Sequence, residues 1–400
     1  SDVYKRQKIC YMDHRKFLDP THKWRFDKRR FNGKVELRES PPILSGTDIE
    51  LLLRGYVNRF GGAKEKGKKR DTPFKKKSIF FDLPYWCHNP LRHNLDAIHI
   101  EKNVCDNILG TLLNISGKSK DHINARLDLQ ELGIRRSLHP VESDDGNHVE
   151  IRAAIFDMTN KEKKIFCSVL KNVKLPYGCA SNISRYVHSS ERKIMGYKSH
   201  DAHFMLHYLL AFCVKRTLKP EVALPLIRLS AFLRGLWNKA VDLEDIKRLQ
   251  QEIIEILCQF EMIFTPPFFD IMVHLLIHLC NEVELGGPEH LRCMFSIERY
   301  LAKLKSYVRN RSKPEGSIAE GYLAEECVTF CSRFLGGDGG MENSMYSTNL
   351  EPCPAEVQYH IGTRKNKDGK IFKLKEIEWE ATHRYVLFNS GNEEIERLIE

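Results

Sequence analysis

Apolar residues recur at three- and four-residue spacing through most of the second half of the chain. This period is typical of amphipathic helices that bury one face against a common core. Pro220, Pro225 and Asn238 are expected to separate successive helices. The helices predicted from this pattern span residues 203–214, 223–237, 243–260, 295–310 and 319–334.

The first half of the chain carries shorter helical signals. Helices are predicted over residues 96–113 and 123–132. Thr159 and Glu162 have the spacing of a capping box, which predicts that another helix begins there.

The sequence pattern indicates little regular structure in the other segments of the first half. The apolar run Ile79-Phe80-Phe81, followed by Leu83, predicts a short buried strand. Residues 8–63 are polar and loop-rich, and residues 1–7 show neither a helix nor a strand pattern. The predicted fold class is therefore mainly α, with helical bundle-like segments and a little β.

Composition shifts along the chain predict four regions. They are a basic, loop-rich segment (1–78), a helical region (79–180), a second helical region (181–335) and a turn-rich tail (336–400) with a short helix at 381–388. No apolar run reaches the ~18 residues that a membrane span needs, so no membrane is expected among the partners. The twelve cysteines are scattered and form no CxxC pair, which favours a reducing compartment over a disulfide framework.

Charge points to a polyanionic partner. The chain has 63 Lys and Arg against 53 Asp and Glu, a net charge of +10. Eight Lys or Arg lie within residues 61–77, a segment that suits a solvated linker or a nuclear-import or phosphate-contacting segment. A second basic run follows residue 303. The candidate phosphate-contacting residues are Lys66, Lys68, Lys69, Arg70, Lys75, Lys76, Lys77, Lys303, Lys305, Arg309 and Arg311.

A further helix is predicted to begin at Pro266-Pro267 and to end at Gly286-Gly287-Pro288. Within it, His274 and His278 are four residues apart and should lie side by side on one face of a buried helix. Two such imidazoles suit a metal ion, although a pair of core histidines bonded to the backbone fits the pattern as well.

Glu298 opens a charged strip on the next predicted helix. Ile297, Leu301, Leu304 and Val308 are predicted to form its buried stripe, which leaves Glu298 on the surface beside Lys305 and Arg309. This strip has two interpretations. Glu298 is either a metal-binding carboxylate beside cations that contact phosphates, or an ordinary surface charge screened by solvent.

Two looser clusters have no recognisable metal spacing. One contains His93, Asp96, His99, Glu101 and Lys102, for which helix capping by Asp96 and packing are the favoured roles. The other contains Cys10, His14 and His22, with zinc as a weaker alternative. The chain has no motif for nucleotide hydrolysis, Rossmann redox chemistry or serine hydrolysis.

Several segments resemble the transposase of plant CACTA (En/Spm-like) DNA transposons over roughly residues 8–390. The stretch 274–335 is similar to the domain of unknown function that follows the core of these transposases. The matching segments read WCHNPLRHNLDAIHIEKNVCDNILGTLL, DHINARLDLQELGIRRSLHP, KSHDAHFMLHYLL, EWEATHRYVLFN and HLLIHLCNEVELGGPEHLRCMFSIERYLAKLKSYVRNRSKPEGSIAEGYLAEECVTFCSRFL.

The resemblance implies a cut-and-paste transposase with an RNase H-like core and an acidic DDE triad that binds Mg²⁺ or Mn²⁺. Related recombinases of the Transib and RAG type also have a zinc site, made of a CxxC and a later His pair. His274 and His278 match that pair, and Glu298 matches the third acid. The partner implied is transposon-end DNA, in the nucleus, with a possible homo-oligomer and no small-molecule substrate.

The resemblance places the CxxC and both catalytic aspartates N-terminal to Cys10. The chain is therefore expected to be a fragment of a longer transposase that by itself cleaves no DNA and binds little or no metal. A non-catalytic transposon remnant, or a host-adopted protein that binds DNA or other proteins, is the alternative. A helical scaffold without affinity for nucleic acid is the third possibility, which the charge of +10 disfavours.

Overall fold

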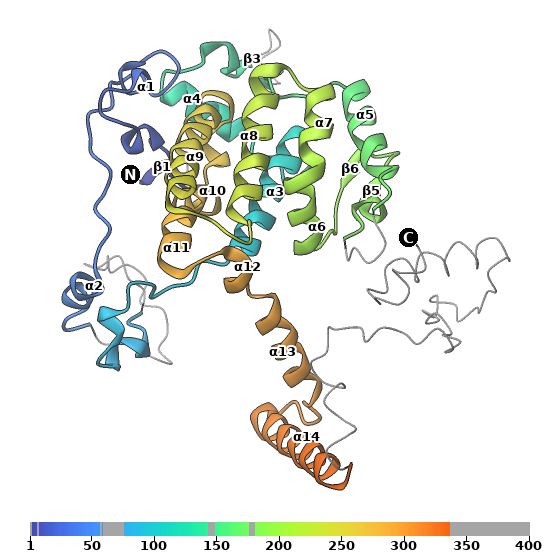
Figure 1. Cartoon of the computed structure of the whole chain (residues 1–400). Helices are drawn as coiled ribbons and strands as arrows, with labels where there is room; N and C mark the ends of the chain where they lie inside the picture. Colours follow the sequence, from blue (N-terminus) through green and yellow to red (C-terminus); the bar gives the residue numbers. More distant parts are fainter. Residues whose placement is uncertain are drawn as a thin grey trace, which may run out of the picture. The chain divides into compact units, whose positions relative to one another are not determined.

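The computed structural model of the chain describes residues 2–5, 8–56, 58, 76–142, 149–175 and 181–336 (Figure 1). The chain divides into two compact units, Ser1–Glu298 and Arg299–Glu400. The described residues are mainly helical, as predicted, and none of their helices is long and apolar enough to cross a membrane.

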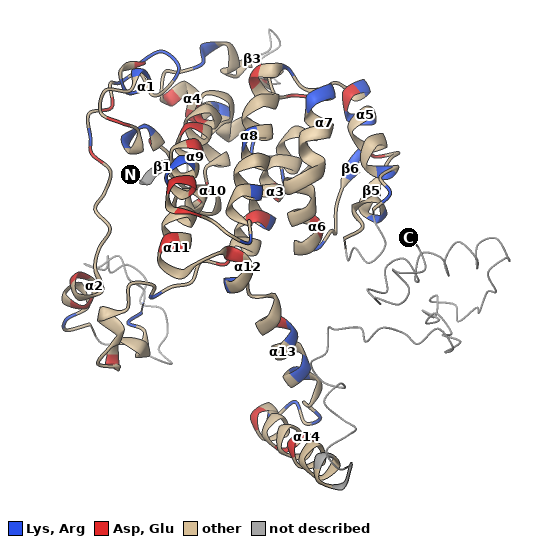
Figure 2. Ribbon diagram, in the orientation of Figure 1, with Lys and Arg blue, Asp and Glu red and all other residues tan. Residues whose placement is uncertain are grey.

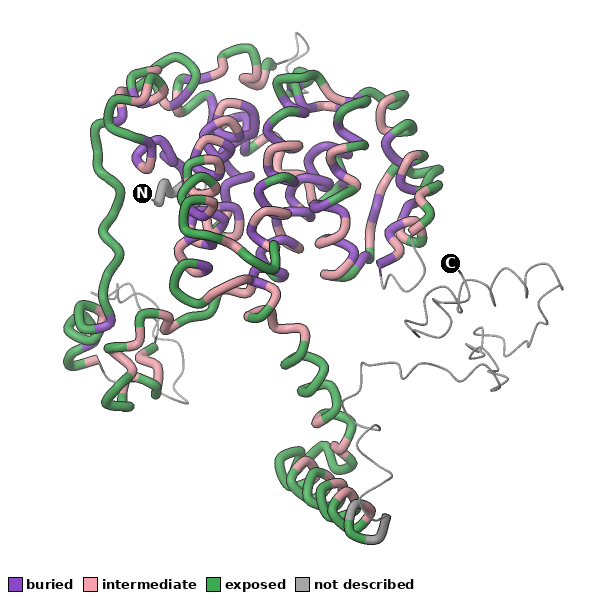
Figure 3. The backbone as a smooth tube through the Cα atoms, in the orientation of Figure 1, coloured by how far each residue is buried: buried purple, intermediate pink, exposed green. Residues whose placement is uncertain are grey.

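The centre of the first unit is a layer of helices. Helices α9, α8, α7 and α5 lie side by side in that order (Figure 1), and α3 packs against α6 and α10. Most residues of α3 are buried, and Figure 3 shows buried positions concentrated where these helices meet. The bounds are α3 Ala97–Leu112, α4 Ile123–Glu131, α5 Asn160–Lys171, α6 Ser199–Phe204, a π-helical turn Met205–Leu209, α7 Leu210–Thr217, α8 Pro220–Leu236 and α9 Leu243–Ile263.

Local capping signals begin these helices where the sequence predicts. Asp96 caps α3 by accepting a hydrogen bond from the backbone N–H of His99. Thr159 and Glu162 form the expected capping box of α5. The break predicted at Pro225 is wrong, because Pro225 is buried inside a continuous α8 that is packed between α7 and α9.

The segment after α9 is less regular than predicted. It consists of η7 Pro266–Phe268, α10 Ile271–Leu275, the 3₁₀ turn η8 Leu276–His278, α11 Leu279–Gly286 and α12 Glu289–Arg292. The 3₁₀ turn η8 thus interrupts the single helix that the sequence predicts and separates α10 from α11. The end predicted at Gly286-Gly287-Pro288 is confirmed, since Gly287 closes α11 at φ 82°.

The N-terminal residues form a hairpin that the sequence pattern missed. Strand β1 (Asp2–Lys5) pairs antiparallel with β2 (Lys8–Tyr11), with Val3 opposite Cys10. The N–H of Tyr11 donates to the carbonyl of Phe269 at 2.7 Å. Tertiary docking therefore holds a strand that has no alternating pattern of its own.

Two buried arginines order the loops that follow the hairpin. Arg15 donates to the carbonyls of Asp27 and Lys34, at 3.0 and 3.1 Å. Arg25 donates to the carbonyls of Leu18 and Arg38, at 2.9 and 2.7 Å. Backbone carbonyls thus accept most of the hydrogen bonds of the two buried guanidinium groups, although Arg15 Nε has no partner among the described residues. This loop-rich segment is held without long secondary structure.

The buried strand predicted near residue 80 is wrong. Residues Ile79–Asp82 form the 3₁₀ turn η2, in which Ile79 is 72% exposed. The Ser78 hydroxyl accepts a hydrogen bond from the N–H of Phe80, whose ring stacks on Trp86 at 4.6 Å. A capped local turn has therefore replaced strand pairing.

The other described elements of the first unit are short. They are η1 His14–Phe17, α1 Lys23–Phe26, α2 Gly46–Leu52, η3 Trp86–His88, η4 Arg136–Leu138, η5 Ile183–Tyr186, and the strand pairs β3 Val141–Glu142 with β4 Val149–Glu150 and β5 Val187–His188 with β6 Lys193–Ile194.

Helix α13 (Phe295–Ser306) begins in the first unit and continues into the second, which also contains α14 (Pro314–Gly336). The stripe predicted to be buried on α13 is wrong: Ile297 and Leu301 are 47% and 54% exposed. No residue of α13 is buried (Figure 3). The periodicity is present, but among the described residues no element buries that face. The helix predicted at 381–388 lies outside the described residues.

The packing of α9 predicts a contrast between two leucines of that helix. Leu257→Ala should destabilise the full chain by about 2–5 kcal/mol, because Leu257 is fully buried. Leu243→Ala should stay within about 0.5 kcal/mol of the parent, because Leu243 is 60% exposed. Urea denaturation followed by circular dichroism measures both, and equal losses would contradict the packing described.

Candidate functional site

His274 and His278 lie close together, as their spacing predicts, but the prediction that they share one continuous buried helix is wrong: they belong to two successive elements and are both partly exposed. His274 is on α10 and His278 ends η8. Their ring centroids are 5.2 Å apart and the rings meet edge to face. Asp270 positions this segment by capping α10 through the backbone N–H groups of Met272 and Val273.

A third histidine reaches this pair from the N-terminal segment. His14 Nε2 lies 3.2 Å from His274 Nδ1, and His14 Nδ1 lies 2.5 Å from Glu261 Oε1 on α9. The backbone N–H of His14 also donates to Glu261, and the ring of Tyr11 stacks on His274. Glu261, His14, His274 and His278 therefore form one connected group, which we call the His14 cluster.

The histidines of the pair are held neutral. Burial, together with the neighbouring His14 and His278, lowers the pKa of His274 to about 3. Burial also lowers the pKa of His278, and His14 and Lys16 contribute to that shift. Neutral imidazole is the form that binds metal ions.

The loose set of Cys10, His14 and His22 is not brought together as a metal site. His14 turns to Glu261 and His274, whereas the ring of His22 accepts a hydrogen bond from the N–H of Trp24 at the start of α1. Cys10 is buried in the core. Among the described residues, these three therefore take separate structural roles.

Glu298 lies in the first turn of α13 and is exposed, as the helical pattern predicts. Its backbone N–H donates to the carbonyl of Met294 at 2.7 Å. In the described part of the chain, no group of possible metal ligands includes Glu298. The structure thus offers one accessible carboxylate at this position.

The candidate DNA-contacting cations come from two basic runs, one around α13 and one within residues 66–77. Lys305, Arg309 and Arg311 are exposed, and Figure 2 shows basic residues along α13. Lys303 makes an ion pair with Glu325 of α14, within the second unit. In the other basic run, Lys77 pairs with Asp82 at 2.9 Å, and Lys76 has an interaction of its own. Lys66, Lys68, Lys69, Arg70 and Lys75 lie outside the described residues.

A second cluster brings together residues that the sequence analysis did not combine. Glu101 of α3 is fully buried, and its carboxylate lies 2.6 Å from His203 Nδ1 and 3.0 Å from His207 Nε2. Trp237 Nε1–H donates to the same carboxylate at 2.7 Å. Glu101, His203 and His207 are a group whose ligand atoms all lie within 4.8 Å of one another, and we call them the Glu101 cluster.

Signals for the Glu101 cluster exist in the sequence but lie far apart. His203 and His207 have the same four-residue spacing as His274 and His278. Glu101 belongs to a separate loose cluster around His93 and His99, and nothing local links it to residues a hundred positions away. The tertiary packing of α3 against α6 makes the connection.

Burial opposes ionisation of Glu101, but hydrogen bonds from His203 and His207 outweigh it, so the pKa of this carboxyl lies below its usual value. Burial lowers the pKa of His207, which therefore stays neutral near pH 7. The Glu101 cluster thus contains an ionised carboxylate facing a neutral imidazole.

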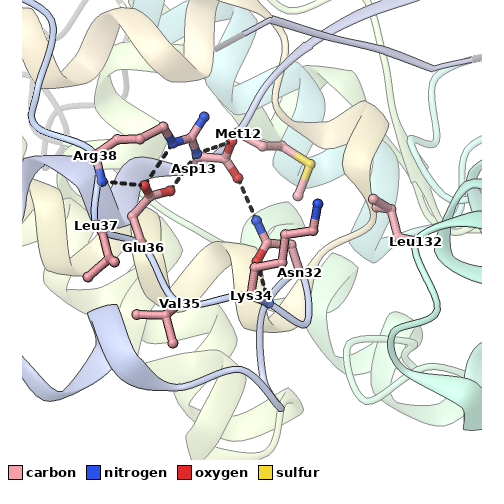
Figure 4. Close-up of a pocket in the computed structure, with 9 residues that line it drawn as sticks. All are labelled: Met12, Asp13, Asn32, Lys34, Val35, Glu36, Leu37, Arg38 and Leu132. Atoms are coloured by element: carbon pink, nitrogen blue, oxygen red, sulfur yellow. Dashed lines mark hydrogen bonds and ion pairs between the residues drawn. The ribbon is translucent and has the colours of Figure 1, made fainter.

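A pocket near the N-terminus has its acidic groups already paired. Arg38 donates to Glu36 Oε1 and to Asp13 Oδ2, both at 2.8 Å, and Asn32 donates to Asp13 Oδ1 at 3.1 Å (Figure 4). Leu132 and Met12 close an apolar wall. These contacts stabilise the loop and pair both acids of the described lining with Arg38.

Two family models match the chain. The model of the transposase family tnp2 matches residues 1–54, and that of a domain of unknown function (DUF4218) matches residues 236–346. No curated protein and no solved structure matches the chain. The two matches indicate a transposase-type protein.

The His14 cluster predicts a pH dependence of stability. The pKa of His274 is about 3 in the folded chain and has its ordinary value of 6.5 in the unfolded chain. At a pH between these two values, His274 binds a proton in the unfolded chain but not in the folded chain. Stability is therefore complete above about pH 6.5 and falls as the pH drops towards 3, by about 1–2 kcal/mol between pH 7 and 5 for this residue. Urea unfolding with a chelator present should show a smaller loss for His274→Gln than for the parent.

The exposed His99 on α3 supplies the matched control. His99→Gln should keep the pH dependence of the parent. An equal loss in the parent and in His274→Gln would show that His274 titrates normally in the folded protein.

Proposed function

Because the chain is of the transposase type, we propose that it is part of a cut-and-paste DNA transposase of the CACTA (En/Spm-like) class, with an RNase H-like core and a DDE triad. The observation that carries the proposal is the pair of family-model matches, over residues 1–54 and 236–346. The tnp2 segment and the DUF4218 segment follow each other in the order that the resemblance implies, and the second contains His274, His278 and Glu298. A chromosomal DNA substrate places this activity in the nucleus.

We assign Glu298 the role of the third catalytic acid. Its exposed position lets the carboxylate bind a divalent ion without stranding a charge in the core. One carboxylate cannot hold the two ions of phosphoryl transfer, which need converging acidic ligands ~3.5–4 Å apart. The two aspartates would come from a segment of the intact transposase that precedes Cys10, and this chain alone would not cleave DNA.

His274 and His278 suit the zinc site that the resemblance implies. Their imidazoles are neutral, and their ring centroids lie 5.2 Å apart. Zinc would crosslink the α10–η8 segment to the CxxC segment, and without those cysteines the pair should bind the ion weakly.

Of the candidate phosphate-contacting residues, Lys305, Arg309 and Arg311 are exposed, which suits contact with DNA phosphates. A DNA-binding protein without strand-transfer activity is the second candidate function, and it would use the same surface. The two candidates differ in cleavage, which depends on Glu298.

DNA binding should be sensitive to salt and tolerant of sequence. The double variant Arg309→Gln with Arg311→Gln should reduce the slope of log affinity against log salt by about 0.9 per lost contact, or about 1.8 in total. Fluorescence anisotropy with duplexes of unrelated sequence, titrated at several salt concentrations, measures the slope.

Arg248→Gln is the control, because Arg248 is exposed on α9 and already pairs with Asp245. It should leave the slope unchanged. If the parent binds no duplex at low salt, neither DNA-binding function holds, and the helical scaffold remains.

The role of Glu298 predicts a separation of cleavage from binding. In the transposase that includes the segment upstream of Cys10, Glu298→Gln should abolish strand cleavage, because it keeps the shape but removes the charge that holds a divalent ion. DNA affinity should stay within about twofold of the parent, since a neutral amide at one exposed site removes no cation–phosphate contact. Cleavage of labelled transposon ends and anisotropy on the same preparation measure both properties.

Glu320→Gln is the matched control on the exposed surface of α14. It should retain cleavage. Cleavage by the Glu298→Gln protein would return Glu298 to an ordinary surface charge and favour the non-catalytic alternative.

A further inference from the structure

The Glu101 cluster contains a fully buried carboxylate whose described hydrogen-bond partners are two histidines and a tryptophan. In the part of the chain that the structure describes, the hydrogen bonds to Glu101 come from His203, His207 and Trp237. Trp237 donates a neutral N–H, and no Lys or Arg is among these partners. A buried carboxylate normally pairs with a cation or coordinates a metal ion.

The charge of Glu101 also acts on a second buried acid, Glu289 of α12. Arg292 pairs with Oε1 of Glu289, whereas Oε2 has no hydrogen-bond partner among the described residues. The pKa of Glu289 is raised to about 7 by burial, and the charges of Glu282 and Glu101 contribute to the shift against Arg292. The guanidinium of Arg234 donates to the backbone carbonyl of His207.

A local irregularity of the helix shapes the cluster. The π-helical turn Met205–Leu209 follows α6 directly and contains His207. The two imidazole rings lie with centroids 3.9 Å apart. Single π turns inside α-helices often occur at functional sites, because they re-aim side chains that a regular helix would place differently.

The ligand atoms are close to the geometry of a metal site. Zinc binds imidazole nitrogen and carboxylate oxygen at about 2.0–2.2 Å, which puts neighbouring ligand atoms of a tetrahedral ion about 3.3 Å apart. The carboxylate lies 2.6 Å from His203 and 3.0 Å from His207. An ion would therefore replace these two hydrogen bonds after the groups move apart by about 0.3–0.7 Å.

We propose that Glu101, His203 and His207 form a binding site for a divalent transition-metal ion, with zinc as the ion that fits best. Two imidazoles and one carboxylate match the nitrogen and oxygen donors that zinc takes in three-ligand sites, with water completing the tetrahedron. Trp237 would be a positioning residue that holds the carboxylate in place through its N–H. This site is separate from Glu298 and from the His274 pair, and it does not depend on the proposed transposase activity.

The side chain of His203 gives the ion a route into the site. It is 25% exposed, whereas those of His207 and Glu101 are 2% and 0% exposed. An ion can therefore arrive at His203 first and displace its hydrogen bond to Glu101. The variant His203→Gln is consequently the one least disruptive to folding.

The test uses the full chain in which His274 and His278 are both replaced by Gln, so that the other histidine pair cannot bind the metal. The protein is stripped with a chelator, loaded with zinc and dialysed, and the metal content is measured by mass spectrometry. Competition with a zinc-binding dye gives the affinity. We expect one zinc ion per chain, and cobalt in its place should give the visible absorption of a four-coordinate ion.

His203→Gln and Glu101→Gln should each weaken zinc binding at least tenfold, and Trp237→Phe should weaken it by about 10–100-fold, as lost outer-shell partners do. His99→Gln, on the same helix as Glu101, should change nothing. Circular dichroism identifies any variant that fails to fold, in which case His203→Gln decides. No zinc above the buffer blank, or equal affinity in the parent and His203→Gln, would overturn the site and leave a metal-free hydrogen-bond network.

Discussion

The carboxylate of Glu101, buried on α3, connects several helices of the first unit directly. It accepts hydrogen bonds from His203 on α6, His207 on the π turn and the side chain of Trp237 at the end of α8. A buried charge is costly unless it is paired, and removing one partner of such a group typically costs several kcal/mol. The positions of three helices are therefore restricted by the need to satisfy one carboxylate.

The same constraint joins the N-terminal segment to the helices. Glu261 on α9 binds both the ring and the backbone N–H of His14, and His14 reaches His274. The buried Arg126 makes a two-point contact with Asp121, at 2.5 and 2.6 Å. Residues 1–54, which match the tnp2 model, thus pack within one unit against residues that match the DUF4218 model.

The second unit differs from the first in chemistry. The first unit contains ion pairs with a buried cation, such as Arg126 with Asp121, whereas the described cations Lys305, Arg309 and Arg311 of the second unit are exposed. The apolar residues Tyr322, Leu323 and Val328 of α14 are exposed as well. Exposed cations suit contact with a phosphate backbone, while the paired charges of the first unit serve to hold the fold.

Local sequence determined where many helices begin and end. The Asp96 cap, the Thr159–Glu162 capping box and the Gly287 terminator act within one or two turns, so their effect can be read from neighbouring residues. The proximity of His274 to His278 follows in the same way from four-residue spacing. Glu298 is exposed as the helical pattern of α13 predicts, but so are Ile297 and Leu301, which the same pattern predicts to be buried.

Only the tertiary structure decided which faces are buried and which distant residues meet. The apolar stripe of α13 has the right period but stays exposed, and the apolar run at Ile79 forms a capped turn because no strand pairs with it. The hairpin of β1 and β2 has no strand pattern, yet it docks on Phe269. Glu101 meets His203 and His207, and His14 meets His274, across more than a hundred residues. Periodicity reports the face that a helix or strand offers, whereas burial and long-range pairing depend on which other element packs against it.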